Sequence, residues 1–140
     1  MTSPSPLTKD DAQRWLADAF APWVQALDLT IAEIGPERAV LTMPITPDLA
    51  RMGGIVSGQA LAAMADTAMV FACAGYFGEM RPIATTTLDT HFLRPGRGTM
   101  IRCEAEVVRA GKALIFTRAT LIARPEEKAT ATATATFFAA

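Results

Sequence analysis

Histidine and cysteine are scarce in this chain, which contains one His and two Cys among its 140 residues. His91 is the single histidine, and Cys73 and Cys103 lie far apart in apolar segments rather than in a Cys-x-x-Cys pair. These counts argue against the usual Cys/His zinc sites and against a serine nucleophile activated by a neighbouring histidine. We expect two buried, reduced thiols, no metal site and a cytoplasmic location.

Charge is also sparse, because only 19% of the residues are charged and the formal net charge is −1. Without a basic excess, neither nucleic acid nor an anionic membrane is an expected partner. The N-terminal sequence MTSPSPLTKDD has no basic segment followed by an apolar run, so we expect no signal peptide. The apolar stretch 55–77 is long enough to raise the question of a membrane span. However, its central Asp66 opposes insertion by roughly 2.5–3.5 kcal/mol, so we expect a buried helix.

The apolar pattern predicts a single α+β domain over residues 1–140, in which residues 1–28 form an N-terminal helical extension. We expect helices over 8–27 and 57–76, and extended segments over 29–43, 84–93, 100–109, 113–124 and 128–139. Pro22 is expected to kink or divide the first helix. Short turns separate the last four segments, which predicts successive hairpins in an antiparallel sheet. The second helix is apolar nearly all round, which predicts that the sheet wraps it.

Asp66 is the single charged side chain between Met52 and Gly78. Burying a carboxylate among small apolar neighbours is unfavourable unless something compensates, and burial raises the pKa of the carboxyl group. Carboxylates perturbed in this way concentrate at functional sites. The sequence therefore makes Asp66 the leading candidate for a functional residue, with a structural, hydrogen-bonded Asp as the alternative.

Three segments together resemble the hotdog-fold acyl-CoA thioesterases of the phenylacetate-degradation (PaaI-like) type. They are GGIVSGQ at 53–59 with ADTA at 65–68, HFLRPGRG at 91–98, and the closing strand sequence ATATF at 133–137. The resemblance implies a hotdog fold, in which a curled antiparallel sheet wraps one long central helix. It also implies hydrolysis of an acyl-CoA to the free acid and coenzyme A, without a metal or redox cofactor. The implied assembly is a homodimer, with dimers pairing into a homotetramer.

The resemblance assigns catalytic roles to Asp66, Gly58 and Thr85. Asp66 would act as a general base on water, or would attack the carbonyl itself to give a mixed anhydride. The backbone N–H at Gly58, near the positive end of the helix, would stabilise the oxyanion. Thr85 would hydrogen-bond the attacking water or Asp66. The alternatives are that Gly58 serves helix–sheet packing and that Thr85 is an ordinary strand residue.

Four further residues are candidates for binding the substrate: Ser57, Gln59, Arg51 and Arg94. Ser57, Gln59 and Arg51 stand where the family pattern has a His, a second Gly and an Asn. Ser57 and Gln59 could hydrogen-bond the acyl group or position water, although Ser57 also suits a plain helix N-cap. An arginine such as Arg94 could meet the phosphates of coenzyme A.

The spacing between Gly58 and Asp66 predicts how the site is assembled. Eight helical residues span about 12 Å at 1.5 Å per residue, too far for both groups to act on one carbonyl from the same helix. If both are catalytic, Asp66 of one chain must meet Gly58 of another. We therefore expect an obligate homodimer with two equivalent sites at the interface.

Two other functions remain open at this stage. A non-catalytic hotdog module that binds acyl-CoA would explain the replaced His and Asn, although a binding pocket gains nothing from a desolvated carboxylate. A hotdog dehydratase is less favoured, because those enzymes use a histidine with an acidic partner and His91 lacks that neighbourhood. The sequence does not specify the acyl group.

Overall fold

A computed structural model describes residues 7–139, so residues 1–6 of the expected N-terminal extension and Ala140 lie outside the described part. The described elements are α1 (Lys9–Ala19), α2 (Pro22–Gln25), β1 (Thr30–Ile34), β2 (Ala39–Pro44), β3 (Ala50–Arg51), β4 (Ile55–Val56), α3 (Gly58–Phe77), β5 (Ile83–Phe92), β6 (Met100–Ala110), β7 (Leu114–Arg124) and β8 (Lys128–Ala139).

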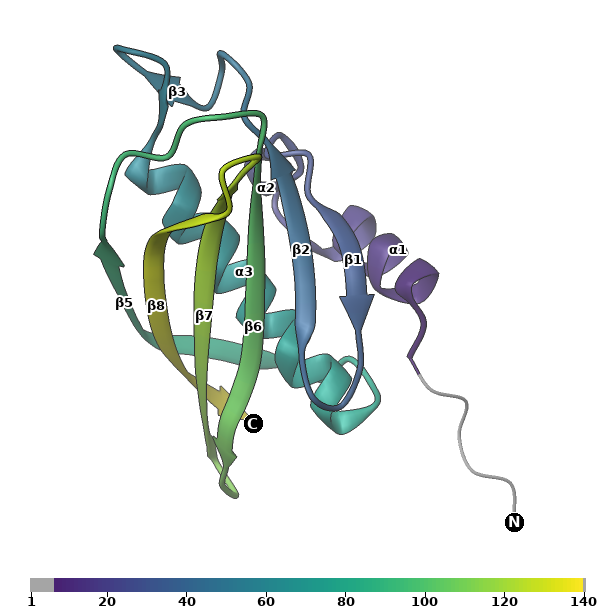
Figure 1. The fold of residues 1–140 in the computed structure, drawn as a ribbon. Coiled ribbons are helices and arrows are strands. Elements are labelled where there is room, and N and C mark those ends of the chain that lie inside the picture. Colours follow the sequence, from purple (N-terminus) through teal and green to yellow (C-terminus); the bar gives the residue numbers. More distant parts are fainter. Residues whose placement is uncertain (1–6, 140) are drawn as a thin grey trace.

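The main sheet has six strands in the order β1-β2-β6-β7-β8-β5, and every neighbouring pair is antiparallel. It curves around the single long helix α3, while α1 lies near the β1 edge (Figure 1). Along β6 and β7, side chains alternate between the helix side and the outer face, so that Ile101, Cys103 and Leu121 are fully buried. This arrangement is the hotdog fold that the family resemblance implies.

The expectation of successive hairpins is wrong for the first of the last four strands. β5 does not pair with β6; it pairs with β8 at the far edge of the sheet. The segment with Arg94-Pro95-Gly96 therefore crosses from one edge of the sheet to β6 instead of closing a tight turn (Figure 1). The last three strands do form successive antiparallel pairs, β6 with β7 and β7 with β8.

Helix α3 spans Gly58–Phe77, one residue from the expected 57–76 at each end. Ser57 is the N-cap, and its side-chain oxygen accepts a hydrogen bond from the Ala60 N–H at 3.2 Å. Gly78 ends the helix in the left-handed conformation with φ 77°, which glycine adopts without steric cost. The helix is long and apolar enough to cross a membrane, with a mean hydropathy of 1.5, but 67% of its most apolar window is buried inside the protein.

The N-terminal segment is two helices rather than one. Pro22 occupies the first turn of α2, and the chain is extended at Phe20 between α1 and α2. Thr8 caps α1 through a capping box with Asp11. The loop before α3 contains a short hairpin, β3–β4, that the sequence pattern does not predict.

Candidate active site

Asp66 and Thr85 come together where α3 meets the strand β5. Thr85 lies on β5 opposite the buried Phe137, so its side chain points to the helix side of the sheet. There its hydroxyl donates a hydrogen bond of 2.9 Å to Oδ1 of Asp66. Of the two hydrogen bonds expected of Thr85, to the attacking water or to Asp66, the structure contains the one to Asp66.

The Asp66 carboxylate is half-buried on a stripe of α3 that the sheet leaves partly uncovered. Its helix neighbours Ala62, Ala63 and Val70 are also half-buried, whereas the opposite stripe, with Leu61, is in the core. Burial raises the pKa of Asp66 above its ordinary value, and the hydrogen bond from Thr85 opposes this in part. The carboxylate therefore holds a proton more readily than an exposed Asp, which suits a group that must take a proton from water.

The N-terminus of α3 presents unpaired backbone donors. The Ala60 N–H is capped by Ser57, and the Leu61 N–H donates to the Ser57 carbonyl at 3.2 Å. Within residues 7–139, no acceptor takes the N–H of Gly58 or of Gln59. Unpaired N–H groups at a helix start carry partial positive charge and suit an oxyanion.

A pocket of about 380 Å³ brings three of the predicted residues together: Gly58, Arg51 and Arg94. Gly58 lies in its wall, Arg51 comes from the short strand β3, and Arg94 follows the end of β5. The remaining lining is mainly apolar and includes Val56, Leu61, Phe92 and Leu93. Ser57 and Gln59 adjoin this pocket in sequence without lining it, and Asp66 and Thr85 are not part of its lining either.

Phe92 lines the same pocket and is not among the residues predicted from the sequence. Its ring meets the side of Gly58 where a larger residue would carry Cβ: an added Cβ would lie 3.2 Å from the ring carbon Cζ. The signal that could have identified Phe92 is its place in the HFLRP segment, beside the predicted Arg94.

Edge strand β5 is uncovered over its whole length. None of its ten residues is buried, and within the described chain it pairs only with β8. Its other edge therefore presents a row of backbone N–H and C=O groups without strand partners, an arrangement that proteins usually cover. Asp66 and Thr85 lie directly beside this uncovered region.

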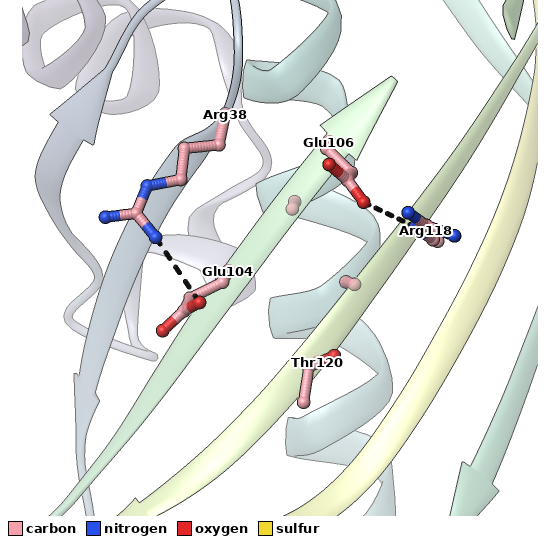
Figure 2. Close-up of a pocket in the computed structure, with 7 residues that line it drawn as sticks. Arg38, Glu104, Glu106, Arg118 and Thr120 are labelled. Carbon is pink, nitrogen blue, oxygen red and sulfur yellow. Dashed lines mark hydrogen bonds and ion pairs between the residues drawn. The ribbon is translucent and has the colours of Figure 1, made fainter. Parts of the chain in front are cut away.

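A second pocket in the described part of the chain contains none of the predicted site residues. A depression of about 190 Å³ lies on the outer face of the sheet, where Arg38 pairs with Glu104 and Arg118 pairs with Glu106 (Figure 2). None of the predicted site residues lines it, and its charges neutralise one another.

Cys73 and Cys103 are both buried, as the sequence predicts. Burial raises the pKa of Cys73 to about 12 and raises that of Cys103 as well, so neither thiol is a ready nucleophile. Within residues 7–139, no group of three His, Cys, Asp or Glu residues is placed to hold a metal ion.

Comparison with known proteins places this geometry in a family. The sequence pattern of the thioesterase superfamily matches residues 53–130, more than half of the chain. No protein of curated function matches the chain significantly in sequence.

Solved structures agree with this assignment. A thioesterase family protein from Silicibacter pomeroyi is 28% identical, with a TM-score of 0.81, over 91% of this chain and 94% of its own. A variant of the phenylacetic acid degradation protein PaaI from Thermus thermophilus is 25% identical, with a TM-score of 0.74, over 86% of this chain and 100% of its own. PaaI from E. coli, 21% identical, has a TM-score of 0.81 over 94% of this chain and 91% of its own; it supports the fold alone.

The matched region contains Gly58, Asp66, Thr85 and Arg94, and membership of this superfamily supports thioester hydrolysis in general. The chain therefore belongs to the thioesterase superfamily, and it has the hotdog fold that it shares with the PaaI proteins.

Proposed function

We propose that the protein hydrolyses the thioester of an acyl-CoA to the free acid and coenzyme A. The proposal depends above all on Asp66, a half-buried carboxylate that accepts a hydrogen bond from Thr85 beside an uncovered strand. A carboxylate that only supported the fold would gain nothing from a site where burial disfavours its charged form.

Asp66 can break the thioester in two ways. As a general base it takes a proton from water, whose oxygen attacks the carbonyl carbon; the C–S bond then breaks and coenzyme A leaves. As a nucleophile its own oxygen attacks the carbonyl carbon, which releases coenzyme A and leaves a mixed anhydride that water hydrolyses. If water attacks the Asp66 carboxyl carbon of this anhydride, ¹⁸O from labelled water enters the Asp66 carboxylate; mass spectrometry after a single turnover would detect this label, which the base route does not produce.

In both routes negative charge develops on the carbonyl oxygen. The unpaired N–H of Gly58 is the donor that we assign to this oxygen. Because Gly58 and Asp66 are about 12 Å apart along α3, the Gly58 that serves a given Asp66 belongs to a second subunit. The proposed enzyme is accordingly a homodimer with two equivalent sites.

The uncovered strand β5 supports this assembly. Pairing of β5 with β5 of a second copy would satisfy the unpaired backbone groups at the sheet edge. Such an isologous contact repeats the same surface on both subunits, so it generates two identical sites. It would also cover the half-buried side of α3 that carries Asp66.

The pocket beside Gly58 is where we place contacts to coenzyme A. Arg51 and Arg94 lie in its lining, where their guanidinium groups suit the phosphates of the cofactor moiety. The Ser57 hydroxyl accepts the cap bond from Ala60 and keeps its own proton free for the substrate. Gln59 is exposed at the same helix end, within the first turn of α3.

The test is release of coenzyme A from short-chain, medium-chain and aromatic acyl-CoAs, followed with a thiol reagent. We expect turnover by the wild type and a loss of about 10²–10⁴-fold in Asp66→Asn. Asp89→Asn is the matched control, because Asp89 lies on the same strand as Thr85 but opposite the exposed Thr134, on the outer face. Binding of acyl-CoA without release would instead favour the non-catalytic binding module.

Three expectations from the sequence stay predictions. They are the absence of a metal or redox cofactor from the reaction, the pairing of dimers into tetramers, and a cytoplasmic location. Turnover after dialysis against a chelator and the mass of the assembly in solution would test the first two.

A further inference from the structure

The contact between Phe92 and Gly58 joins two parts of the chain at the proposed oxyanion site. A Cβ added to Gly58 would lie 3.2 Å, 3.4 Å and 3.7 Å from the Cζ, Cε1 and Cε2 atoms of the Phe92 ring. The tip of the ring thus rests against the glycine. Because Cα–Cβ bonds in a helix tilt toward its N-terminus, the ring lies on the side of Gly58 from which the unpaired N–H groups emerge.

Phe92 is not part of the hydrophobic core. It is the last residue of β5 and lies opposite the buried Ala131, so its side chain points to the helix side of the sheet. Even so, 55% of the residue is exposed. An aromatic ring that is half in water, yet in contact with the first residue of the central helix, contributes to a surface that a ligand can complete.

We propose that Phe92 is a positioning residue for the thioester carbonyl. This inference rests on the proposed function. The ring forms the wall beside the Gly58 N–H, keeps water from that donor and holds the carbonyl carbon against the helix end. A hydrogen bond in a site closed to water is electrostatically stronger than one exposed to it. Removing the ring therefore weakens stabilisation of the oxyanion more than it weakens binding of the substrate.

The test compares Phe92→Ala and Phe92→Leu with Phe138→Ala. Phe138 is the matched control, since it is 45% exposed and lies opposite Leu114 on the outer face of the sheet. With the acyl-CoA that the wild type hydrolyses fastest, we expect kcat to fall about 10-fold or more in Phe92→Ala while KM changes less than about threefold. Phe92→Leu, which keeps an apolar wall, should recover much of the loss.

A spectroscopic measurement separates positioning from a structural effect. In the Asp66→Asn background, the C=O stretch of a bound acyl-CoA labelled with ¹³C at the carbonyl should shift to lower frequency, because the Gly58 N–H polarises it. Adding Phe92→Ala should move the stretch back toward its value in water, and adding Phe138→Ala should not.

Three results would overturn the inference, and they are distinguishable. Wild-type kcat in Phe92→Ala would overturn the role of Phe92 and leave the proposed function intact. A lower kcat with an unchanged carbonyl stretch would show that the ring is structural; if Phe92→Ala does not fold, Phe92→Leu gives the same two readouts. If the wild type releases no coenzyme A, the proposed function fails and this inference fails with it.

Discussion

At the scale of single residues, the pH dependence of the protein's stability shows whether Asp66 has a catalytic or a structural role. Its pKa is raised by burial, so in the folded state it binds its proton more tightly than in the unfolded chain. The stability that this proton provides is fully present below the unfolded pKa, 3.8, and is lost as pH rises through the higher folded pKa. A carboxylate whose charged form supported the fold would show the reverse.

We therefore expect Asp66→Asn to increase the free energy of unfolding at neutral pH, even though it should lower turnover by about 10²–10⁴-fold. The gain should shrink as the pH is lowered toward 3.8, and urea unfolding at a series of pH values measures it. Destabilisation by Asp66→Asn at neutral pH would show that the carboxylate supports the fold. Asp89→Asn serves again as the control.

Thr85 should set the pH dependence of turnover. Its hydrogen bond to Asp66 lowers the pKa of the carboxyl group, against the larger effect of burial. In Thr85→Val, which keeps the shape and the strand preference, that pKa should rise, and the acid limb of the kcat/KM profile should move to higher pH. Thr85→Ser should restore the wild-type profile. An unchanged acid limb in Thr85→Val would show that Asp66 is not the group whose titration produces that limb.

The Gly58 N–H can be deleted without rebuilding the helix. Gly58 is the first residue of α3, where proline is well tolerated, and Ser57 already has the extended backbone, ψ 147°, that a following proline requires. Gly58→Pro should lower kcat by about 10²–10³-fold, the usual loss for one oxyanion donor. Gly58→Ala carries a similar Cβ against Phe92 but keeps the N–H, so its smaller loss isolates the donor. Equal losses in both variants would indicate crowding instead.

At the scale of elements, substitution of Leu88 tests whether the exposed strand β5 forms the dimer interface. This residue is 38% exposed and lies opposite the buried Ala135, on the helix side of the sheet. Leu88→Asp places a charge in the expected interface, so we expect monomers that keep their circular dichroism spectrum and lose turnover. Light scattering measures the mass of each variant in solution and so distinguishes monomers from dimers. Leu114→Asp, on the outer face at 41% exposure, should remain dimeric; a dimeric Leu88→Asp would place the interface elsewhere.

The helices and strands also show which features of the fold local sequence patterns predict and which they do not. Ser57 and Gly78 define α3 through local capping chemistry, and the alternation along β6, β7 and β8 defines those strands. The position of β5 could not be read in this way, because alternation predicts a strand and its faces but not its neighbour. The β3–β4 hairpin was missed because its strands have only two residues each, too few for a period.

For the candidate site, too, single residues could be predicted from the sequence but the contacts between them could not. Asp66 was identified from the sequence because a single charge interrupts an apolar helix, whereas Thr85 and Arg94 came from the family resemblance. The Asp66–Thr85 hydrogen bond and the contact of Phe92 with Gly58 join segments that are distant in sequence. Such contacts depend on how the sheet closes around the helix, which no local pattern encodes.

At the scale of the whole molecule, the proposed chemistry requires that each site be built from two chains. Along α3, Gly58 and Asp66 are about 12 Å apart, and Asp66 lies beside the uncovered edge strand. Each subunit of a dimer would then supply the carboxylate to one site and the helix end to the other. Both the proposed chemistry and the proposed assembly depend on this sharing of residues between subunits.

Complementation between two inactive variants would test whether the two subunits share each site. Asp66→Asn and Gly58→Pro subunits, co-expressed with different affinity tags, are purified through both tags so that the dimers are mixed. In a mixed dimer, one site carries both substitutions and the other carries none. We expect about half of the wild-type turnover per dimer, because one of two equivalent sites is intact. Mixed dimers as inactive as their parents would show that Asp66 and Gly58 do not act across the interface, and the shared site would then be ruled out.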